Sequence, residues 1–320
     1  MGEARQMTKL FGAVEGGGTK FVCAVGAGPQ DRLRTERIAT TTPDETLARV
    51  RQFLVETAAH AKQPLAAVGI ATFGPIELDP KSDHYGCMLP TTKPGWSGAP
   101  IVAPLTGGLD LPVGLDTDVN GAALGEYSWG AAQGCDPTVY LTVGTGIGGG
   151  AVVGGQPLHG LLHPEMGHVR VPRARDTAGR LDPFPGICPF HGDCLEGLAS
   201  GPALAARTGR AASDLAADDP VWHLEAAYLA AALAHYVLIL SPQCVVVGGG
   251  VLEQPHLLPR VRRELRRLLG NYIPRTQVAA GLDRYVVAPY WGAEAGLAGA
   301  FVLAEQAAAA STVADQQTPR

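Results

Sequence analysis

The sequence lacks the features that mark membrane and secreted proteins. Its longest apolar stretch, residues 226–240, is too short to span a bilayer and contains His235. The N-terminal residues contain no long apolar run and no small-residue cleavage site, and Gln6 stands where a myristoylation signal requires serine or threonine. We therefore expect a soluble, cytoplasmic protein with no membrane partner.

The sequence also has no excess of lysine and arginine over aspartate and glutamate. The 320 residues include 25 Lys and Arg against 30 Asp and Glu, a net charge of −5, so no general attraction to nucleic acid is expected. The basic run from Arg260 to Arg267 lies at helical spacing, and we interpret it as the solvated face of a helix rather than a nucleic-acid contact. The positions of this helix predicted to face inward are Leu257, Val261, Leu265 and Leu268.

A disulfide framework is not expected either. The chain has six cysteines, and they are scattered except for the pair Cys188 and Cys194. Small disulfide-stabilised domains are instead dense in cysteine. Cys23 and Cys244 lie in strand-like apolar runs and are predicted to be small core residues.

The order of strand-like and helix-like segments indicates an α/β protein. With 46% hydrophobic residues, the chain can form one large domain or two of moderate size. Strands alternate with helical segments twice along the chain, and each half opens with a strand, a glycine turn and a second strand. This pattern predicts two similar halves with a cleft between them.

Glycine-rich turns follow three strand-like runs, at residues 15–20, 144–150 and 248–250. Glycine allows backbone N–H groups to converge on an anion. The first turn is not a P-loop, because Lys20 is followed by strand-like residues. The second contains G-x-G-x-x-G but also precedes a strand, which removes the context of a dinucleotide fingerprint. A plain hairpin explains any one turn, whereas three such turns favour a nucleotide held between two lobes.

Asp118 is a candidate general base. It falls where the strand-like residues 111–115 give way to a helix, and ligands gather at the carboxyl ends of strands in α/β sheets. A carboxylate there can accept the proton of a hydroxyl group that attacks ATP. The alternatives are that Asp118 only caps the helix, or that Asp116 is the base.

Residues 188–194, CPFHGDC, suggest a metal site. Cys188, His191 and Cys194 supply three nitrogen or sulfur ligands at spacings that zinc accepts, and a fourth protein ligand would make the metal structural. A disulfide is disfavoured in a reducing compartment, and a redox pair would require C-x-x-C spacing.

Eight segments occur in the order found in the ROK family of sugar kinases and sugar-responsive repressors, which the chain resembles from about Phe11 to Phe301. They are EGGGTKF, FGPIELD, TTKPGW, DTDVNGAALGE, LTVGTGIGGG, HPEMGH, CPFHGDCLEGLASGPAL and VVVGGGV. The bacterial fructokinase subgroup is the most similar. The resemblance implies a two-lobed actin-like ATPase (ribonuclease H-like) fold that closes on ATP, Mg²⁺ and sugar. The expected N-terminal lobe is residues 1–120 with a closing helix at about 293–310. The expected C-terminal lobe is residues 121–292, with a zinc loop at about 163–196.

The resemblance also implies roles for individual residues, with Asp118 as the general base. Residues 15–20 and 142–149 would be phosphate loops, and residues 247–250 would be part of the adenosine site. The expected nucleotide contacts are Gly17, Gly18, Thr19, Lys20, Gly144, Thr145, Gly146, Gly248, Gly249 and Gly250. The expected sugar contacts are Gly74, Pro75, Thr92, Thr117, Glu165, His168 and Glu196. The expected ligands of a structural Zn²⁺ are His168, Cys188, His191 and Cys194, with His163 as the competitor of His168.

Three positions depart from the common family pattern. Glu15 stands where most relatives have aspartate, and Thr117 stands where glucose-type kinases carry asparagine. His191 replaces the middle cysteine of most zinc loops, as in the fructokinase subgroup. We therefore predict ATP-dependent phosphorylation of D-fructose to fructose 6-phosphate, and the resemblance alone implies a homodimer. The alternatives within the family are glucokinase, mannokinase and N-acetylmannosamine kinase.

A non-catalytic sugar sensor or DNA-binding repressor is a further alternative. The presence of Asp118 argues against it, as does the acidic net charge. Only fourteen residues precede Glu15, which is too few for a helix-turn-helix. We therefore expect hexose and ATP as partners, and no nucleic acid.

Overall fold

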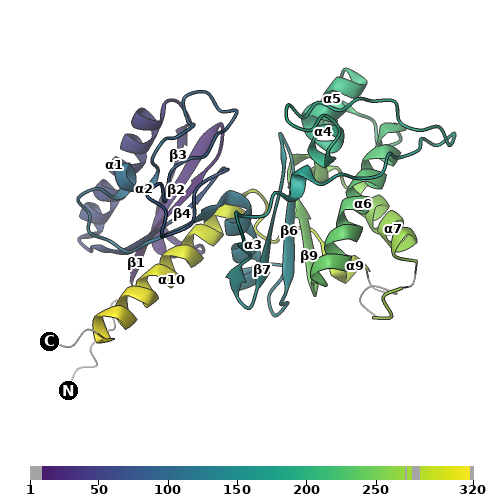
Figure 1. Cartoon of the computed structure of the whole chain (residues 1–320). Helices are drawn as coiled ribbons and strands as arrows, with labels where there is room; N and C mark the ends of the chain where they lie inside the picture. The colour runs from purple at the N-terminus through teal and green to yellow at the C-terminus, as the bar shows by residue number, and fades with distance from the viewer. Residues whose placement is uncertain (1–8, 271, 276–281, 318–320) are drawn as a thin grey trace. The chain divides into compact units, whose positions relative to one another are not determined.

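The computed structural model describes residues 9–270, 272–275 and 282–317 (Figure 1). These residues fall into two compact units. Unit 1 is drawn from Met1–Ser128, His159–His163 and Glu294–Arg320, and unit 2 from Trp129–Leu158 and Pro164–Ala293. Each unit contains one five-stranded sheet.

The sheet of unit 1 has the strand order β3-β2-β1-β4-β5. The first three strands form an antiparallel meander, and β4 and β5 run parallel to β1. The strands are β1 (Leu10–Gly16), β2 (Lys20–Gly28), β3 (Asp31–Ala39), β4 (Leu65–Thr72) and β5 (Val113–Thr117). The helices are α1 (Pro43–Ala61), α2 (Val102–Thr106), α3 (Asp118–Trp129) and α10 (Ala295–Gln317).

The sheet of unit 2 has the order β10-β9-β6-β7-β8, which repeats the pattern of unit 1. Again three strands form an antiparallel meander and two run parallel to its first strand. The strands are β6 (Thr138–Val143), β7 (Ile147–Val153), β8 (Gln156–Pro157), β9 (Cys244–Gly248) and β10 (Val286–Val287). This repeat confirms the prediction of two similar α/β halves that each open with a glycine hairpin.

The helices of unit 2 cover its sheet and carry the loops of interest. They are α4 (Leu195–Ala199), α5 (Gly201–Thr208), α6 (Val221–Leu240), α7 (Leu257–Leu269) and α9 (Leu282–Tyr285). Short 3-10 turns are η1 (Met166–His168), η2 (Ala212–Asp214), η3 (Gly250–Glu253) and, in the link to α10, η4 (Gly292–Glu294). Among the described residues, α6 alone is long and apolar enough to cross a membrane by length and composition. More than half of that stretch is buried inside the protein, and its Trp222, Tyr228 and Leu233 belong to the core of unit 2.

The predicted inward face of α7 is correct at three positions and wrong at the fourth. Leu257, Val261 and Leu265 are buried, but Leu268 is 41% exposed and Leu269 is buried in its place. A step of four residues turns about 40° beyond a full circle, whereas a step of three falls about 60° short. Leu269 therefore lies closer than Leu268 to the face that Leu265 defines.

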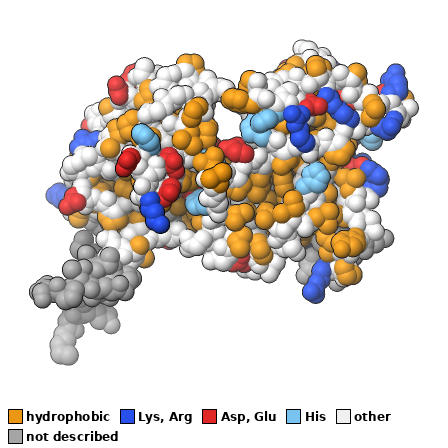
Figure 2. Space-filling model, viewed as in Figure 1, with side chains coloured by type: hydrophobic (Ala, Val, Ile, Leu, Met, Phe, Trp, Pro, Cys, Tyr) orange, Lys and Arg blue, Asp and Glu red, His pale blue; other side chains and the backbone are white. Residues whose placement is uncertain are grey.

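The face of unit 1 shown in Figure 2 carries no basic stripe. Acidic and basic side chains are interspersed on the face of unit 1 shown in Figure 2. On α7, Arg267 pairs with Glu264 at 2.6 Å and the Arg262 guanidinium donates to the Val286 carbonyl oxygen at 2.8 Å. Arg262 and Arg267 therefore serve local contacts.

Helix α10 lies directly against the sheet of unit 1 because glycines stand at the points of contact. A side chain at Gly69 in β4 would collide with the carbonyl oxygen of Ala300, and one at Gly114 in β5 with that of Leu303. At the beginning of the helix, Gly296 faces the carboxylate of Glu15 in β1. The close packing thus brings the N-terminus of α10 to the strand end that precedes the first glycine turn.

Candidate active site and metal centre

Asp118 begins α3 directly after β5 ends at Thr117, as the sequence predicts. Its Oδ1 accepts a hydrogen bond from the Val119 backbone N–H at 2.9 Å. Burial raises the pKa of the Asp118 carboxyl to about 6, although nearby backbone N–H groups act to lower it. Such a carboxylate is ionised at neutral pH, yet it is basic enough to take a proton from a hydroxyl group.

Asp116, the rival carboxylate, is only 2% exposed and is occupied by hydrogen bonds. Its Oδ1 accepts from the Thr117 backbone N–H and from the Asn120 side-chain amide, each at 2.7 Å. Its Oδ2 lies 2.9 Å from Nε2 of His159, and the pKa of His159 is raised chiefly by this hydrogen bond. Since both oxygens are engaged, the geometry favours Asp118 as the base.

Glu15 ends β1 beside the N-terminus of α10, where its carboxylate accepts a backbone hydrogen bond from Leu297. Burial raises the pKa of Glu15 to about 7, and the negative charge of Asp118 adds to the effect. Oε2 of Glu15 is buried and has no hydrogen-bond partner among the described residues. An orphaned carboxylate oxygen close to a second carboxylate fits a hydrated Mg²⁺, which keeps several waters and needs few protein ligands.

The first glycine turn, between β1 and β2, has its carbonyl groups satisfied from within unit 1. The Lys20 carbonyl accepts from the Gly17 N–H at 2.9 Å. The Gly17 and Thr19 carbonyls accept from the hydroxyl and the N–H of Thr40, at 2.7 and 3.0 Å. A Cβ placed on Gly18 would meet nothing within 4 Å. The turn is therefore anchored on its carbonyl side and open at Gly18, as a loop that receives an anion requires.

Lys93, which sequence reasoning missed, reaches this turn. Its ammonium group donates to the Gly18 carbonyl at 2.5 Å. The segment that carries it is held by Trp96, which is fully buried and stacks on Phe21 with ring centroids 5.7 Å apart. The exposed Thr92, an expected sugar contact, directly precedes Lys93. The signal was present in the sequence, since Lys93 lies inside the TTKPGW motif.

Other expected sugar contacts of unit 1 have structural partners. The Thr117 hydroxyl accepts from the Asn120 N–H at 3.2 Å, so it caps the start of α3, and Thr117 is 2% exposed. Gly74 faces the ring of His163. Pro75 is followed by Ile76, whose backbone N–H donates to Nε2 of His163 at 3.3 Å. The structure therefore gives His163 a partner in unit 1.

In unit 2 the second and third glycine turns lie together. Gly144 closes the β6–β7 hairpin by donating to the Gly146 carbonyl at 2.9 Å, with Thr145 between them. A Cβ on Gly144 would come within 4.0 Å of the Gly250 nitrogen. Gly249 has φ +91°, and a side chain there would strike the Val143 backbone. Gly249 is thus required for the close approach of the two turns.

Gly248 ends β9 against Pro289, where a Cβ would lie 2.8 Å from the proline ring. Glu196, in the first turn of α4, accepts from the Ile147 N–H at 2.9 Å through Oε2. This oxygen would lie 2.7 Å from a Cβ on Gly146. The structure thus places Glu196 against the second glycine turn, whereas Glu165 is exposed just before η1.

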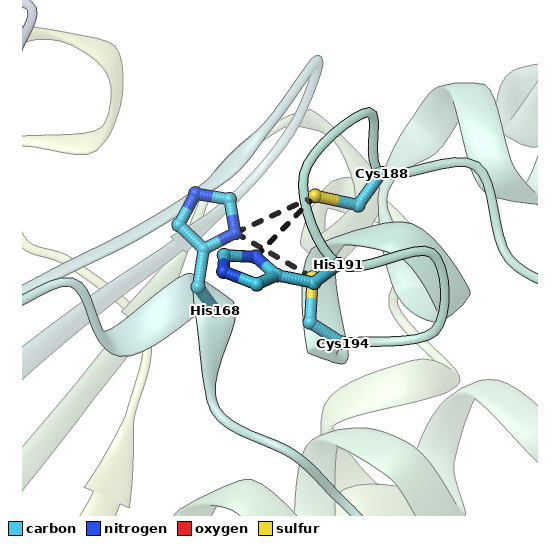
Figure 3. Close-up of side chains that lie close together, drawn as sticks. All are labelled: His168, Cys188, His191 and Cys194. Carbon is cyan, nitrogen blue, oxygen red and sulfur yellow. Dashed lines mark hydrogen bonds between the residues drawn. The ribbon is translucent and has the colours of Figure 1, made fainter.

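Four side chains gather from η1 and from the loop of residues 188–194 that leads into α4. Figure 3 shows His168, Cys188, His191 and Cys194 pointing toward one another, and their ligand atoms all lie within 4.8 Å of each other. Nδ1 of His168 lies 3.5 Å from Sγ of Cys194 and 3.8 Å from Sγ of Cys188, which is 3.7 Å from Nδ1 of His191. For tetrahedral zinc, bond lengths of about 2.0 Å to nitrogen and 2.3 Å to sulfur give an N···S separation of about 3.5 Å.

The donor set and the spacing of this cluster therefore fit Zn²⁺. Burial raises the pKa of the Cys194 thiol to about 11, so its thiolate form needs a positive charge close by. A Cβ on Gly197 in α4 would collide with the Gly192 carbonyl, so the Cys188–Cys194 loop rests directly on the helix that carries Glu196. His163 is not part of the cluster.

Comparison with known proteins decides the family. The model of the ROK family matches residues 11–307. The chain belongs to the ROK family. A fructokinase of Zymomonas mobilis is 42% identical over 301 residues, which cover 92% of this chain and 96% of that protein. A fructokinase of Lactococcus lactis is 40% identical, covering 88% and 92%.

Among solved structures, a ROK hexokinase from Thermus thermophilus matches with a TM-score of 0.76 and 30% identity. The match covers 96% of this chain and 99% of that one. Together with the repeated sheet, it confirms the actin-like ATPase fold that the sequence motifs of this ROK protein predict.

The pKa of Asp118 predicts the pH dependence of this ROK protein as a kinase. A general base must be ionised, so kcat/KM for the sugar should fall about tenfold per pH unit below about pH 6, at saturating Mg²⁺ and ATP. Initial rates between pH 5 and 8 in buffers of constant ionic strength measure this limb. If kcat/KM instead begins to fall only near pH 4, where an exposed aspartate titrates, the assignment of Asp118 is contradicted.

Metal analysis tests the cluster of the ROK protein. The purified protein should contain about one zinc per chain. Cys188→Ser should lose the metal, because it removes a thiolate. His191→Cys should retain zinc, because zinc also binds three cysteines and one histidine. Cys135→Ser, a free cysteine outside the cluster, is the matched control and should leave the metal content unchanged. Native protein without zinc would end this interpretation.

Proposed function

We propose that this ROK protein is an ATP-dependent fructokinase, which converts D-fructose to fructose 6-phosphate. The observation that carries the kinase function is the pair of carboxylates around the end of β5. Asp116 is saturated with hydrogen bonds, and Asp118 has its pKa raised to about 6. The preference for fructose is supported by the high identity to fructokinases over most of the chain.

In the proposed reaction, Asp118 accepts the proton of the 6-hydroxyl group of fructose. The hydroxyl oxygen attacks the γ-phosphorus of ATP in line, and the bond from that phosphorus to the departing ADP oxygen breaks. Backbone N–H groups of the first and second glycine turns, with Lys20 and the Thr145 hydroxyl, bind the phosphates. Gly248, Gly249 and Gly250 line part of the adenosine site.

Two metals complete the proposal. Mg²⁺, when bound, neutralises the phosphate charge that develops during transfer, and Glu15 would hold one of its waters. Zn²⁺ would be held by His168, Cys188, His191 and Cys194, and its role is structural because four protein ligands leave no open position. It would join the turn after Glu165 to the start of the helix with Glu196, and these two carboxylates, with His168, would bind the sugar hydroxyls.

Other sugar kinases of the family are the main alternative. Glucose-type enzymes carry asparagine at the position of Thr117. Here the hydroxyl of this buried residue accepts from the Asn120 N–H, so no amide is presented at this place. This difference favours fructose over glucose. We further propose a homodimer, which the family resemblance implies, and, from the composition of the sequence, a cytoplasmic enzyme without nucleic-acid or membrane partners.

Release of ADP in the presence of different hexoses tests the proposed function. D-fructose with Mg²⁺ and ATP should give the highest kcat/KM, and glucose, mannose and N-acetylmannosamine should each be at least about tenfold poorer. Omission of Mg²⁺ should abolish the signal. Preference for another hexose would overturn the substrate, and no signal with any hexose would overturn the kinase function.

A further inference from the structure

After Leu158 the chain leaves unit 2 and contributes five residues, His159–His163, to unit 1. It returns to unit 2 at Pro164. We name these five residues the strap. It has a histidine at each end, and it leads through Pro164 directly into Glu165 and η1. None of the roles assigned above to glycine turns, carboxylates or metal ligands explains these two histidines.

His159 anchors the first end of the strap. Its Nε2 lies 2.9 Å from Oδ2 of Asp116 and 3.4 Å from Nδ2 of Asn120. Asp116 is 2% exposed, whereas His159 is 40% exposed. A hydrogen bond from a histidine to a buried carboxylate is charge-assisted and therefore stronger than a neutral one.

His163 anchors the second end. It is 6% exposed, and its Nε2 accepts the backbone N–H of Ile76 at 3.3 Å. Because this nitrogen accepts a hydrogen bond, it carries no proton. Loss of the ring would leave the Ile76 N–H buried without this partner, which is costly.

The middle of the strap contributes little to holding it. Gly160 donates to the Leu162 carbonyl at 3.1 Å and closes a tight turn within the strap. Leu161, at the tip, is fully exposed. The strap is therefore held by its two histidines rather than by apolar burial.

Glu165 follows His163 by two residues and precedes His168, a member of the metal cluster, by three. Two residues span about 7 Å at most. Along the chain, Glu165 is thus tethered within two residues of the anchored His163 and within three of His168.

We propose that His159 and His163 are positioning residues, which fix the start of the segment that carries Glu165 and thereby set the affinity for the sugar. The inference rests on the proposed function, in which Glu165 contacts the sugar. Because the strap acts on sugar binding and not on Asp118 or the glycine turns, its loss should change KM for the sugar and spare kcat and KM for ATP.

Five variants test the strap in the full-length, zinc-containing protein. His159→Leu and His163→Leu remove the anchoring nitrogen atoms. His159→Gln keeps a donor for Asp116, and His163→Gln keeps an acceptor for the Ile76 N–H. His84→Gln, at an exposed histidine of unit 1, is the matched control. For each protein, kcat, the KM values for fructose and ATP, zinc content and thermal unfolding are measured.

Each leucine variant should raise KM for fructose about tenfold, with kcat, KM for ATP and zinc content near those of the wild type. The glutamine variants should recover most of the affinity. Unchanged KM for fructose, an equal rise in KM for ATP, or zinc loss in the leucine variants would overturn the inference. If His163→Leu fails to fold, KM for fructose in His159→Leu decides, because His159 is half-exposed and its replacement is better tolerated. If the wild type does not phosphorylate fructose, the proposed function fails. The effect of the strap variants is then measured as the change in KM for the hexose that the wild-type protein phosphorylates.

Discussion

The arrangement of this site depends on the hydrogen bonds that the buried carboxylate of Asp116 accepts. Three donors converge on it, from Thr117, Asn120 and His159. They tie the end of β5 to the first turn of α3 and to a segment forty residues further along the chain. The contacts from Thr117 and Asn120 hold Asp116 within its own strand end and helix, so the neighbouring Asp118 is the carboxylate left to take part in proton transfer. A structural and a chemical carboxylate thus lie two residues apart.

We propose a comparable organising role in unit 2 for the cluster of His168, Cys188, His191 and Cys194. It joins η1 to the loop that packs on α4, and α4 carries Glu196 against the β6–β7 hairpin. Small units of irregular chain cannot hold such a geometry by apolar burial alone, whereas four ligands on one ion can. In each unit, then, we propose that polar contacts rather than apolar burial hold the segments that lead to the sugar carboxylates: His159 on Asp116 in unit 1, and the cluster in unit 2.

Much of the fold could be predicted from the sequence, because its signals are local. The glycine hairpins, the strand that ends before Asp118 and the cysteine–histidine loop each lie within a few residues. The missed features join distant positions. Lys93 meets Gly18, His159 meets Asp116, and Glu15 meets the N-terminus of α10. Local spacing does not encode these contacts. On α7, by contrast, the helical step of four residues from Leu265 alone favours Leu269 over Leu268.

The central claim is that Asp118 acts in chemistry and not in sugar binding. Asp118→Asn keeps the size of the side chain but removes the base. The most direct measurement compares fructose binding by calorimetry with fructose 6-phosphate formation by ³¹P NMR in this variant. We expect nearly unchanged binding and a loss of kcat of about a thousandfold. Near-normal turnover in the variant would contradict it.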